Sequence, residues 1–250
     1  MSKVFYSAAR ALRGGDEKIA TAAVILAAGR STRMGKKQNK QLLTVNDVPV
    51  LAHTLMAYQN CPHIRQIVVV ARQQDFPAIV EIRQAYGIKK MTKLVVGGKD
   101  RQESARFGVS QVDPEIRFVA IADGARCLTT PEQITEVCLR AYKFQAASAG
   151  HLLSSSIKRA TNLGMITESV DREGLWEAQT PQVFHVALYN AAIHKALGDA
   201  FEATDDNQLI EHLGYQVKMV ECGRNNIKIT TPDDILFAKA ALTARETKQK

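Results

Sequence analysis

The sequence of 250 residues has no closely spaced cysteine pair. Its four cysteines form no C-x-x-C motif and are Cys61, Cys127, Cys138 and Cys222. Zinc sites and thioredoxin-like chemistry both depend on such spacing, so neither is supported. Reduced thiols in a cytoplasmic protein are the expected reading.

Long apolar runs are also absent. No segment is apolar for the roughly 20 residues that a membrane-spanning helix needs. The first 21 residues mix basic and acidic side chains and contain no apolar core typical of a secretory signal. We therefore expect a cytoplasmic protein without a membrane partner, and we interpret residues 1–20 as an N-terminal extension.

Aromatic residues are scarce, whereas positive charge is in excess. Phe, Trp and Tyr make up 6% of the chain and the net charge is +8, which indicates an acidic partner. Nucleic acid and a small phosphorylated substrate both qualify. Much of the basic excess lies in residues 30–40, and few rings are present for stacking on bases, so a small phosphorylated molecule is favoured over nucleic acid.

Helical and strand patterns alternate from residue 22 onward. Continuous apolar strands separated by helices predict a parallel sheet that is covered on both faces. Asp75 is a plausible N-cap, and Thr130 with Pro131 opens another helix. The alternation stops at 152–182, which we interpret as an irregular or hairpin insertion leaving the main sheet. The expected strands are 22–27, 67–71, 93–96, 118–122, 216–220 and 227–230, and the expected helices are 49–58, 75–86, 104–112, 130–144, 186–197, 205–213 and one from 232.

A basic loop follows the first strand directly. Between Ile19 and Asn46 the chain has no acidic residue and carries the basic residues Arg30, Arg33, Lys36, Lys37 and Lys40. The strand opens at Gly29, where a small residue allows backbone N–H groups to approach phosphate oxygens. The loop is neither a Walker A motif nor a dinucleotide fingerprint. A solvated basic loop is the alternative, but the local, unbalanced charge at a strand end favours a polyphosphate cradle.

Other polar residues follow the later strands. Asp123 ends the apolar strand 118–122, where a carboxylate can hold a metal or a substrate hydroxyl, or can simply begin a turn. Arg126 makes a mixed polar site more plausible there. Gly97 and Gly98, followed by Ser104 on a helix, can present amides and a hydroxyl to a base or phosphate. Lys228 lies within an expected strand, where a lysine usually faces solvent.

These segments, in this order, resemble the 2-C-methyl-D-erythritol 4-phosphate cytidylyltransferase family of the non-mevalonate isoprenoid pathway. The resemblance covers about residues 21–243. The matching segments are 27–35, 40–41, 97–104, 123–126, 170–172, 175–176, 180–182, 204–206 and 226–230.

The resemblance implies an enzyme that transfers CMP from CTP to 2-C-methyl-D-erythritol 4-phosphate and releases pyrophosphate, with Mg²⁺ as cofactor. It implies an α/β fold with a Rossmann-like, doubly wound, mostly parallel sheet and an extended β-arm used in dimerisation. The expected nucleotidyltransferase domain is 21–245, with the arm at about 152–182 and a tail at 246–250. The expected partners are CTP, a sugar-alcohol phosphate and a second copy of the chain.

The resemblance also implies roles for individual residues. Phosphates of CTP would be held by the catalytic residues Arg33, Lys40 and Lys228. The cytidine would be bound by Ala27, Ala28, Gly29, Gly98 and Ser104. The acceptor would be bound by Asp123, Arg126, Ser156, Arg172 and Thr180, with Arg172 supplied by the partner's arm. Asp123 is also the candidate metal ligand.

The chain departs from the family pattern mainly in the acceptor half of the site. Ala122 stands where the family has His, Cys127 where it has Pro, and Ser155 where the arm has a carboxylate. Three alternatives therefore stay open. They are a cytidylyltransferase for another polyol phosphate such as ribitol 5-phosphate, a non-catalytic CTP-binding paralogue, and a nucleic-acid-binding module.

Overall fold

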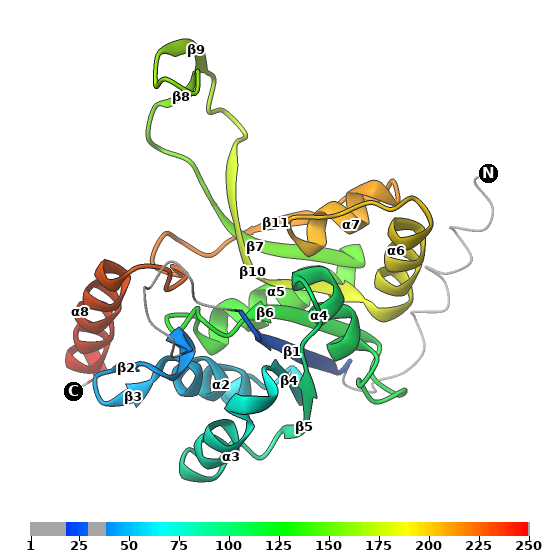
Figure 1. Ribbon diagram of the computed structural model, residues 1–250, viewed down its shortest axis with the longest axis vertical. Coiled ribbons are helices and arrows are strands. Elements are labelled where there is room, and N and C mark those ends of the chain that lie inside the picture. The colour runs from blue at the N-terminus through cyan, green and yellow to red at the C-terminus, as the bar shows by residue number, and fades with distance from the viewer. Residues whose placement is uncertain (1–18, 30–38, 250) are drawn as a thin grey trace.

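The computed structural model describes residues 19–29 and 39–249, and it is built around a seven-stranded sheet (Figure 1). The strand order is β11-β7-β10-β6-β1-β4-β5. Strands β6, β1, β4 and β5 are mutually parallel, β7 pairs with β11 in parallel, and β10 runs antiparallel between β6 and β7. The mostly parallel α/β sheet is therefore confirmed. The bounds are β1 (Thr21–Ala27), β4 (Ile64–Ala71), β5 (Met91–Val96), β6 (Phe118–Asp123), β7 (Ala146–Leu152), β10 (Trp176–His185) and β11 (Lys218–Glu221).

Helices cover both faces of this sheet. Side chains alternate along β1, so Ile25 joins the core cluster beneath α2, α3 and α5, whereas Val24 joins the cluster beneath α4, α6 and α7. Burial on both faces explains why β1 reads as a continuous apolar run. The bounds are α2 (Val50–Asn60), α3 (Phe76–Ala85), α4 (Arg101–Val109), α5 (Pro131–Phe144), α6 (Val186–Gly198), α7 (Asp206–His212) and α8 (Pro232–Gln249).

Helix α4 packs unusually close to the sheet. A Cβ atom added at Gly108 would lie 2.3 Å from Cγ1 of Val24 and 2.7 Å from Cγ2 of Val70. Only glycine allows this approach without movement of the helix. The contact sets the position of α4, and α4 in turn carries Arg101 and Ser104.

The short elements complete the fold. One 3-10 turn precedes α2 and another precedes α3. A small two-stranded ladder also lies just before α2. The other ladder is the hairpin at the tip of the insertion. Their bounds are η2 (Lys40–Leu42), η3 (Gln73–Asp75), β2 (Thr44–Val45), β3 (Val48–Pro49), β8 (Ile157–Ala160) and β9 (Ile166–Val170).

The predictions for the starts of two helices, α5 and α3, have different outcomes. The start of α5 is as expected, since Thr130 and Gln133 form a reciprocal capping box. The prediction that Asp75 caps α3 is wrong, because its side chain makes no capping hydrogen bond and binds Asn39 and Arg72 instead.

The strand expected at 227–230 is also wrong. Among the described residues the segment has no ladder partner, although the N–H of Ile229 donates to the carbonyl of Ala125 at 2.9 Å. Ile227 and Ile229 alternate as in a strand because they pack against the cluster beneath α8 rather than within a sheet.

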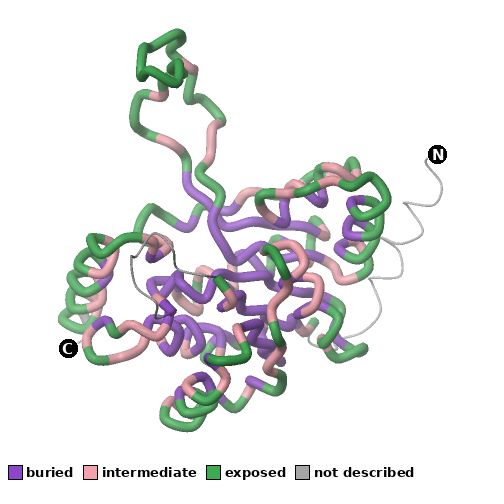
Figure 2. Tube along the Cα trace, viewed as in Figure 1, coloured by how far each residue is buried: buried purple, intermediate pink, exposed green. Residues whose placement is uncertain are grey.

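The insertion projects from the body as a long arm that ends in the β8–β9 hairpin (Figure 1). Figure 2 shows that this arm is mostly exposed. Its expected end at residue 182 needs correction. Strand β10 begins at Trp176 and pairs with β7 from Trp176 to Phe184, so residues 176–182 belong to the main sheet. Helix α8 likewise runs to Gln249, through most of the expected tail.

Candidate active site

The carboxyl ends of β1, β4, β5 and β6 meet at one edge of the sheet, because these strands are parallel. Ala28 and Gly29 follow β1, Gly98 follows β5, and Asp123 ends β6. Most of the predicted nucleotide residues therefore share this edge, where open α/β sheets bind ligands. Arg33 and the other basic residues of 30–38 lie outside the described residues.

Three of the predicted cytidine residues, Ala28, Gly98 and Ser104, lie around Gly97. A Cβ atom added at Gly97 would lie 2.4 Å from Cβ of Ala28 and 3.2 Å from Oγ of Ser104. The N–H of Gly98 donates to Oγ of Ser104 at 3.0 Å, and that hydroxyl donates to the carbonyl of Asp100 at 2.7 Å. Glycine at 97 thus lets the turn after β5 lie directly against the turn after β1.

A buried carboxylate and two cations occupy the end of β6. Lys228 Nζ lies 3.0 Å from Oδ2 of Asp123, and Arg126 Nε lies 3.5 Å from the same oxygen. Lys40 Nζ donates to the carbonyl of Ile229, the residue after Lys228. Lys40 and Lys228, which are both predicted to hold CTP phosphates, are therefore brought to one place from distant parts of the chain.

The ionisation of Asp123 is controlled by its surroundings. Burial raises its pKa, but Lys228, Arg101 and Arg126 favour the charged form and together outweigh burial. The net result is a pKa below the ordinary value for aspartate. Asp123 is therefore a carboxylate at neutral pH and can bind a cation or accept a hydrogen bond, but it cannot donate one.

This lowered pKa predicts a pH-dependent contribution to stability. The folded state favours ionised Asp123, so the contribution is complete above the ordinary pKa of about 3.9 and is lost as pH falls through the lower folded value. We expect the difference in free energy of unfolding between the wild type and Asp123→Asn to shrink from pH 7 to pH 3 in urea titrations. A difference that grows on acidification would contradict the assignment.

Arg126 and the loop before α8 are held together by Asn226. Arg126 Nη1 donates to the Asn226 carbonyl at 2.6 Å, and Thr129 Oγ1 donates to Oδ1 of Asn226 at 2.7 Å. Asn226 Nδ2 then donates to the carbonyl of Thr180 at 2.9 Å. These contacts fix the segment that carries Lys228 without any strand pairing.

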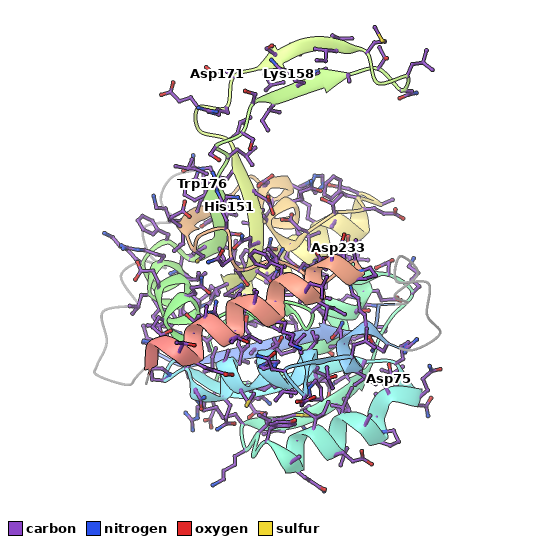
Figure 3. All side chains as sticks on the ribbon, turned by 90° about the vertical axis from the view of Figure 1, so that its left-hand side faces the viewer. Asp75, His151, Lys158, Asp171, Trp176 and Asp233 are labelled. Atoms are coloured by element: carbon purple, nitrogen blue, oxygen red, sulfur yellow. The ribbon has the colours of Figure 1, made fainter. Side chains whose placement is uncertain are left out.

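Of the remaining predicted acceptor residues, Thr180 lies at this site, whereas Ser156 and Arg172 of the same chain lie away from it. The backbone N–H of Asp123 donates to Oγ1 of Thr180 at 3.0 Å. Ser156 and Arg172 lie on the exposed arm, and Arg172 donates to the carbonyl of Ser154. Figure 3 labels Lys158 and Asp171 on the arm, with Trp176 and His151 at its base.

Sequence reasoning missed a further cation, Arg101. Its Nη1 lies 2.6 Å from Oδ2 of Asp206, and Tyr189 donates to the other oxygen of Asp206 at 2.9 Å. Burial lowers the pKa of Arg101, but Asp206 and Asp123 favour its charged form and raise the pKa overall. Arg101 and Asp206 both lie in segments that carried the family resemblance, and this was the only signal available.

A model of the 2-C-methyl-D-erythritol 4-phosphate cytidylyltransferase family matches residues 21–244. The chain belongs to this family. A cytidylyltransferase of this name from Caldanaerobacter subterraneus is 42% identical over 221 residues, which cover 88% of this chain and 97% of the relative. One from Synechocystis is 39% identical over 226 residues, covering 90% and 98%.

Solved structures of cytidylyltransferases agree with the fold. The 4-diphosphocytidyl-2C-methyl-D-erythritol synthase of Anaerococcus prevotii has a TM-score of 0.80 at 28% identity, covering 92% of this chain and all of that one. The Thermus thermophilus 2-C-methyl-D-erythritol 4-phosphate cytidylyltransferase has a TM-score of 0.72 at 27% identity, covering 88% and 98%.

Two of the departures from the cytidylyltransferase pattern fall in the core. Ala122 is 1% exposed and packs beneath α2 and α5, and Cys127 is 2% exposed and packs beneath α8. These substitutions therefore change core packing, not the exposed face of the site. Ser155 is exposed on the arm.

Proposed function

We propose that this protein transfers CMP from CTP to 2-C-methyl-D-erythritol 4-phosphate and releases pyrophosphate. The observation that carries the proposal is the meeting of Lys40, Lys228 and ionised Asp123 at the carboxyl edge of the sheet. The turns at Ala28 and Gly98 lie at the same edge and can present backbone groups to cytosine. We assign the reaction to residues 21–245 as one domain.

The reaction requires fixed cations more than it requires a general base. An oxygen of the acceptor phosphate attacks the α-phosphorus of CTP, and the bond to the α,β-bridging oxygen breaks, so that pyrophosphate leaves with the electron pair. The attacking phosphate is already ionised at neutral pH. The obstacles are repulsion between anions and charge on the leaving group, which positioning and fixed cations relieve.

The cations have two different tasks in this proposal. Lys228 contacts the α-phosphate, where the new bond forms, while Lys40 and Arg33 hold the β- and γ-phosphates that leave. Cytidine is held by the backbone of Ala27, Ala28 and Gly29, with Gly98 and Ser104. A charge pair at 4 Å contributes about 4 kcal/mol at an effective dielectric near 20, so such contacts matter most where water is excluded.

Asp123 is the residue that would hold a magnesium ion at this site. Mg²⁺ typically binds one or two carboxylates together with substrate phosphates, and Asp123 supplies one ionised carboxylate at the strand end. Among the described residues no three His, Cys, Asp or Glu side chains cluster, so Asp123 is the carboxylate that we assign to the ion. Bound Mg²⁺ neutralises phosphate charge.

The acceptor is assigned to the same edge from two chains. Asp123 and Arg126 face it from the body, beside Thr180. Ser156 and Arg172 reach it from the arm of a second copy of the chain, because the arm of one chain carries them away from its own body (Figure 1).

The arm tip is where we expect the homodimer to form. Leu163, Met165 and Ile166 are all at least 65% exposed there. Burying such side chains contributes about 1.5–3 kcal/mol each. We expect Met165→Asp with Ile166→Asp to raise the dimer dissociation constant at least about tenfold in analytical ultracentrifugation and to lower turnover with it. Leu197→Asp on α6 is the matched control, and an unchanged dimer in the arm variant would contradict this role.

The four cysteines are free and buried, as expected for thiols in a reducing compartment, and we propose a cytoplasmic location. Within the described part of the chain, the helices are too short or too polar to cross a bilayer.

The test is pyrophosphate release from CTP and Mg²⁺ with 2-C-methyl-D-erythritol 4-phosphate, with ribitol 5-phosphate and without acceptor. We expect release with the first acceptor only. Release with ribitol 5-phosphate alone would assign the protein to another polyol phosphate. CTP binding without release would indicate a non-catalytic paralogue.

A further inference from the structure

Asp75 makes a buried polar contact that joins the start of α3, the end of β1 and the turn η2. Its side chain makes no capping hydrogen bond to α3. It lies at the start of α3 (Figure 3), and its side chain is 7% exposed. Its carboxylate accepts from Arg72 Nε at 2.7 Å, from Arg72 Nη2 at 3.0 Å, and from Asn39 Nδ2 at 2.9 Å. The two bonds from Arg72 hold the carboxylate in one orientation.

Asn39 extends this contact to the end of β1 and to the turn η2. Its Nδ2 also donates to the carbonyl of Ala27 at 3.1 Å, and its Oδ1 accepts from the N–H of Gln41 at 3.1 Å. Lys40 lies between Asn39 and Gln41 in the sequence and begins η2. Asn39 is 1% exposed, so water does not supply substitutes for these bonds.

The orientation of the Asn39 amide is determined by its neighbours. The Asp75 carboxylate and the Ala27 carbonyl can only accept, so the NH₂ group must face them. The amide oxygen then faces the Gln41 N–H and caps η2. A rotation of this amide would place its oxygen against two acceptors, the Asp75 carboxylate and the Ala27 carbonyl, and its NH₂ group against the Gln41 N–H.

We propose that Asp75, through Asn39, is a positioning residue that sets Lys40 for the triphosphate. The Asp75–Asn39 contact fixes the turn η2 relative to the end of β1, where CTP is proposed to bind. A misplacement of about 1 Å at a reacting centre can cost on the order of a hundredfold in rate. This inference rests on the proposed function of Lys40, but its test also reads CTP binding directly.

The decisive variant is Asn39→Asp, which keeps an oxygen to cap η2 but replaces the donor by a carboxylate facing Asp75. We expect kcat/KM for CTP to fall roughly thirtyfold, while KM for the acceptor changes less than about twofold. Adding Asp75→Asn returns a donor and an acceptor to this contact, and we expect the double variant to recover at least about fivefold of the loss. Glu136→Gln on α5 breaks an exposed pair with Arg140 and is the control.

A double-mutant cycle with Lys40 separates positioning from general destabilisation. If Asp75 and Asn39 act through Lys40, Asn39→Asp in a Lys40→Ala background changes kcat/KM less than about twofold, although it still lowers the melting temperature. Persistence of the full effect in that background, or wild-type kcat/KM in Asn39→Asp, would overturn the proposal.

Calorimetric titration with CTP and Mg²⁺ tests the positioning role of Asp75 and Asn39 separately from the proposed CMP transfer. Wild-type protein that binds CTP but releases no pyrophosphate with any acceptor defeats the proposed function only. In that case roughly tenfold weaker CTP binding by Asn39→Asp, rescued by Asp75→Asn, supports the positioning role, and unchanged binding overturns it.

Discussion

Replacing Lys228 by Ala is expected to lower kcat about a hundredfold or more. Its ammonium group lies 3.0 Å from Asp123 at the carboxyl end of β6, where we propose that the α-phosphate reacts. A cation at the reacting phosphate gains strength as charge develops in the transition state. A hundredfold loss corresponds to about 2.7 kcal/mol of transition-state stabilisation.

The fold is expected to survive this change. Arg126 and Arg101 still favour the ionised form of Asp123 when Lys228 is removed. The melting temperature and CTP binding should therefore change much less than turnover. Lys239→Ala, at an exposed position of α8, is the matched control and should retain wild-type kcat. Turnover close to wild type in Lys228→Ala would remove this lysine from the mechanism.

The centre of the sheet could be predicted because its sequence signal is local. Strand β1 is buried on both faces and is apolar from Ala22 to Ala27. Asp123 could be placed at a strand end for the same reason, since the strand before it is equally apolar.

The other half of the sheet gave a weaker signal. Strand β7 consists mostly of Ala, Ser and Gly, which lack the β-branched and aromatic side chains that mark strands. The start of β10 falls within the stretch 152–182, which lacks a clean helical period and is therefore interpreted as part of the insertion. The pairing of β7 with β10, rather than local propensity, makes both segments strands.

A site residue can be proposed from the sequence where its type is unusual for its position, but not where its meaning depends on a distant partner. The basic residues before Asn46 indicated phosphate without any partner being known. Arg101 precedes the helix expected at 104–112 and carries no local signal of its own, and its partner Asp206 begins another helix far along the chain. Only the folded chain brings the two together.

Replacing Arg101 by Met is expected to lower the free energy of unfolding by about 3–5 kcal/mol, because it leaves a buried charge unpaired. The Asp206 side chain is 1% exposed, and it also accepts a hydrogen bond from Tyr189. Urea titration measures the change. Asp206→Asn in the same chain keeps an oxygen for Tyr189 and removes the stranded charge, so the double variant should recover a large part of the loss.

Arg140→Met is the matched control, because Arg140 and Glu136 are also 2.6 Å apart but are both more than 40% exposed. Exposed pairs contribute about 0–1 kcal/mol, so this variant should unfold almost like the wild type. Equal small losses in both variants would mean that burial of Asp206 does not matter. A large loss in Arg101→Met that persists in the double variant would mean that the arginine acts through packing of its aliphatic part rather than through its charge.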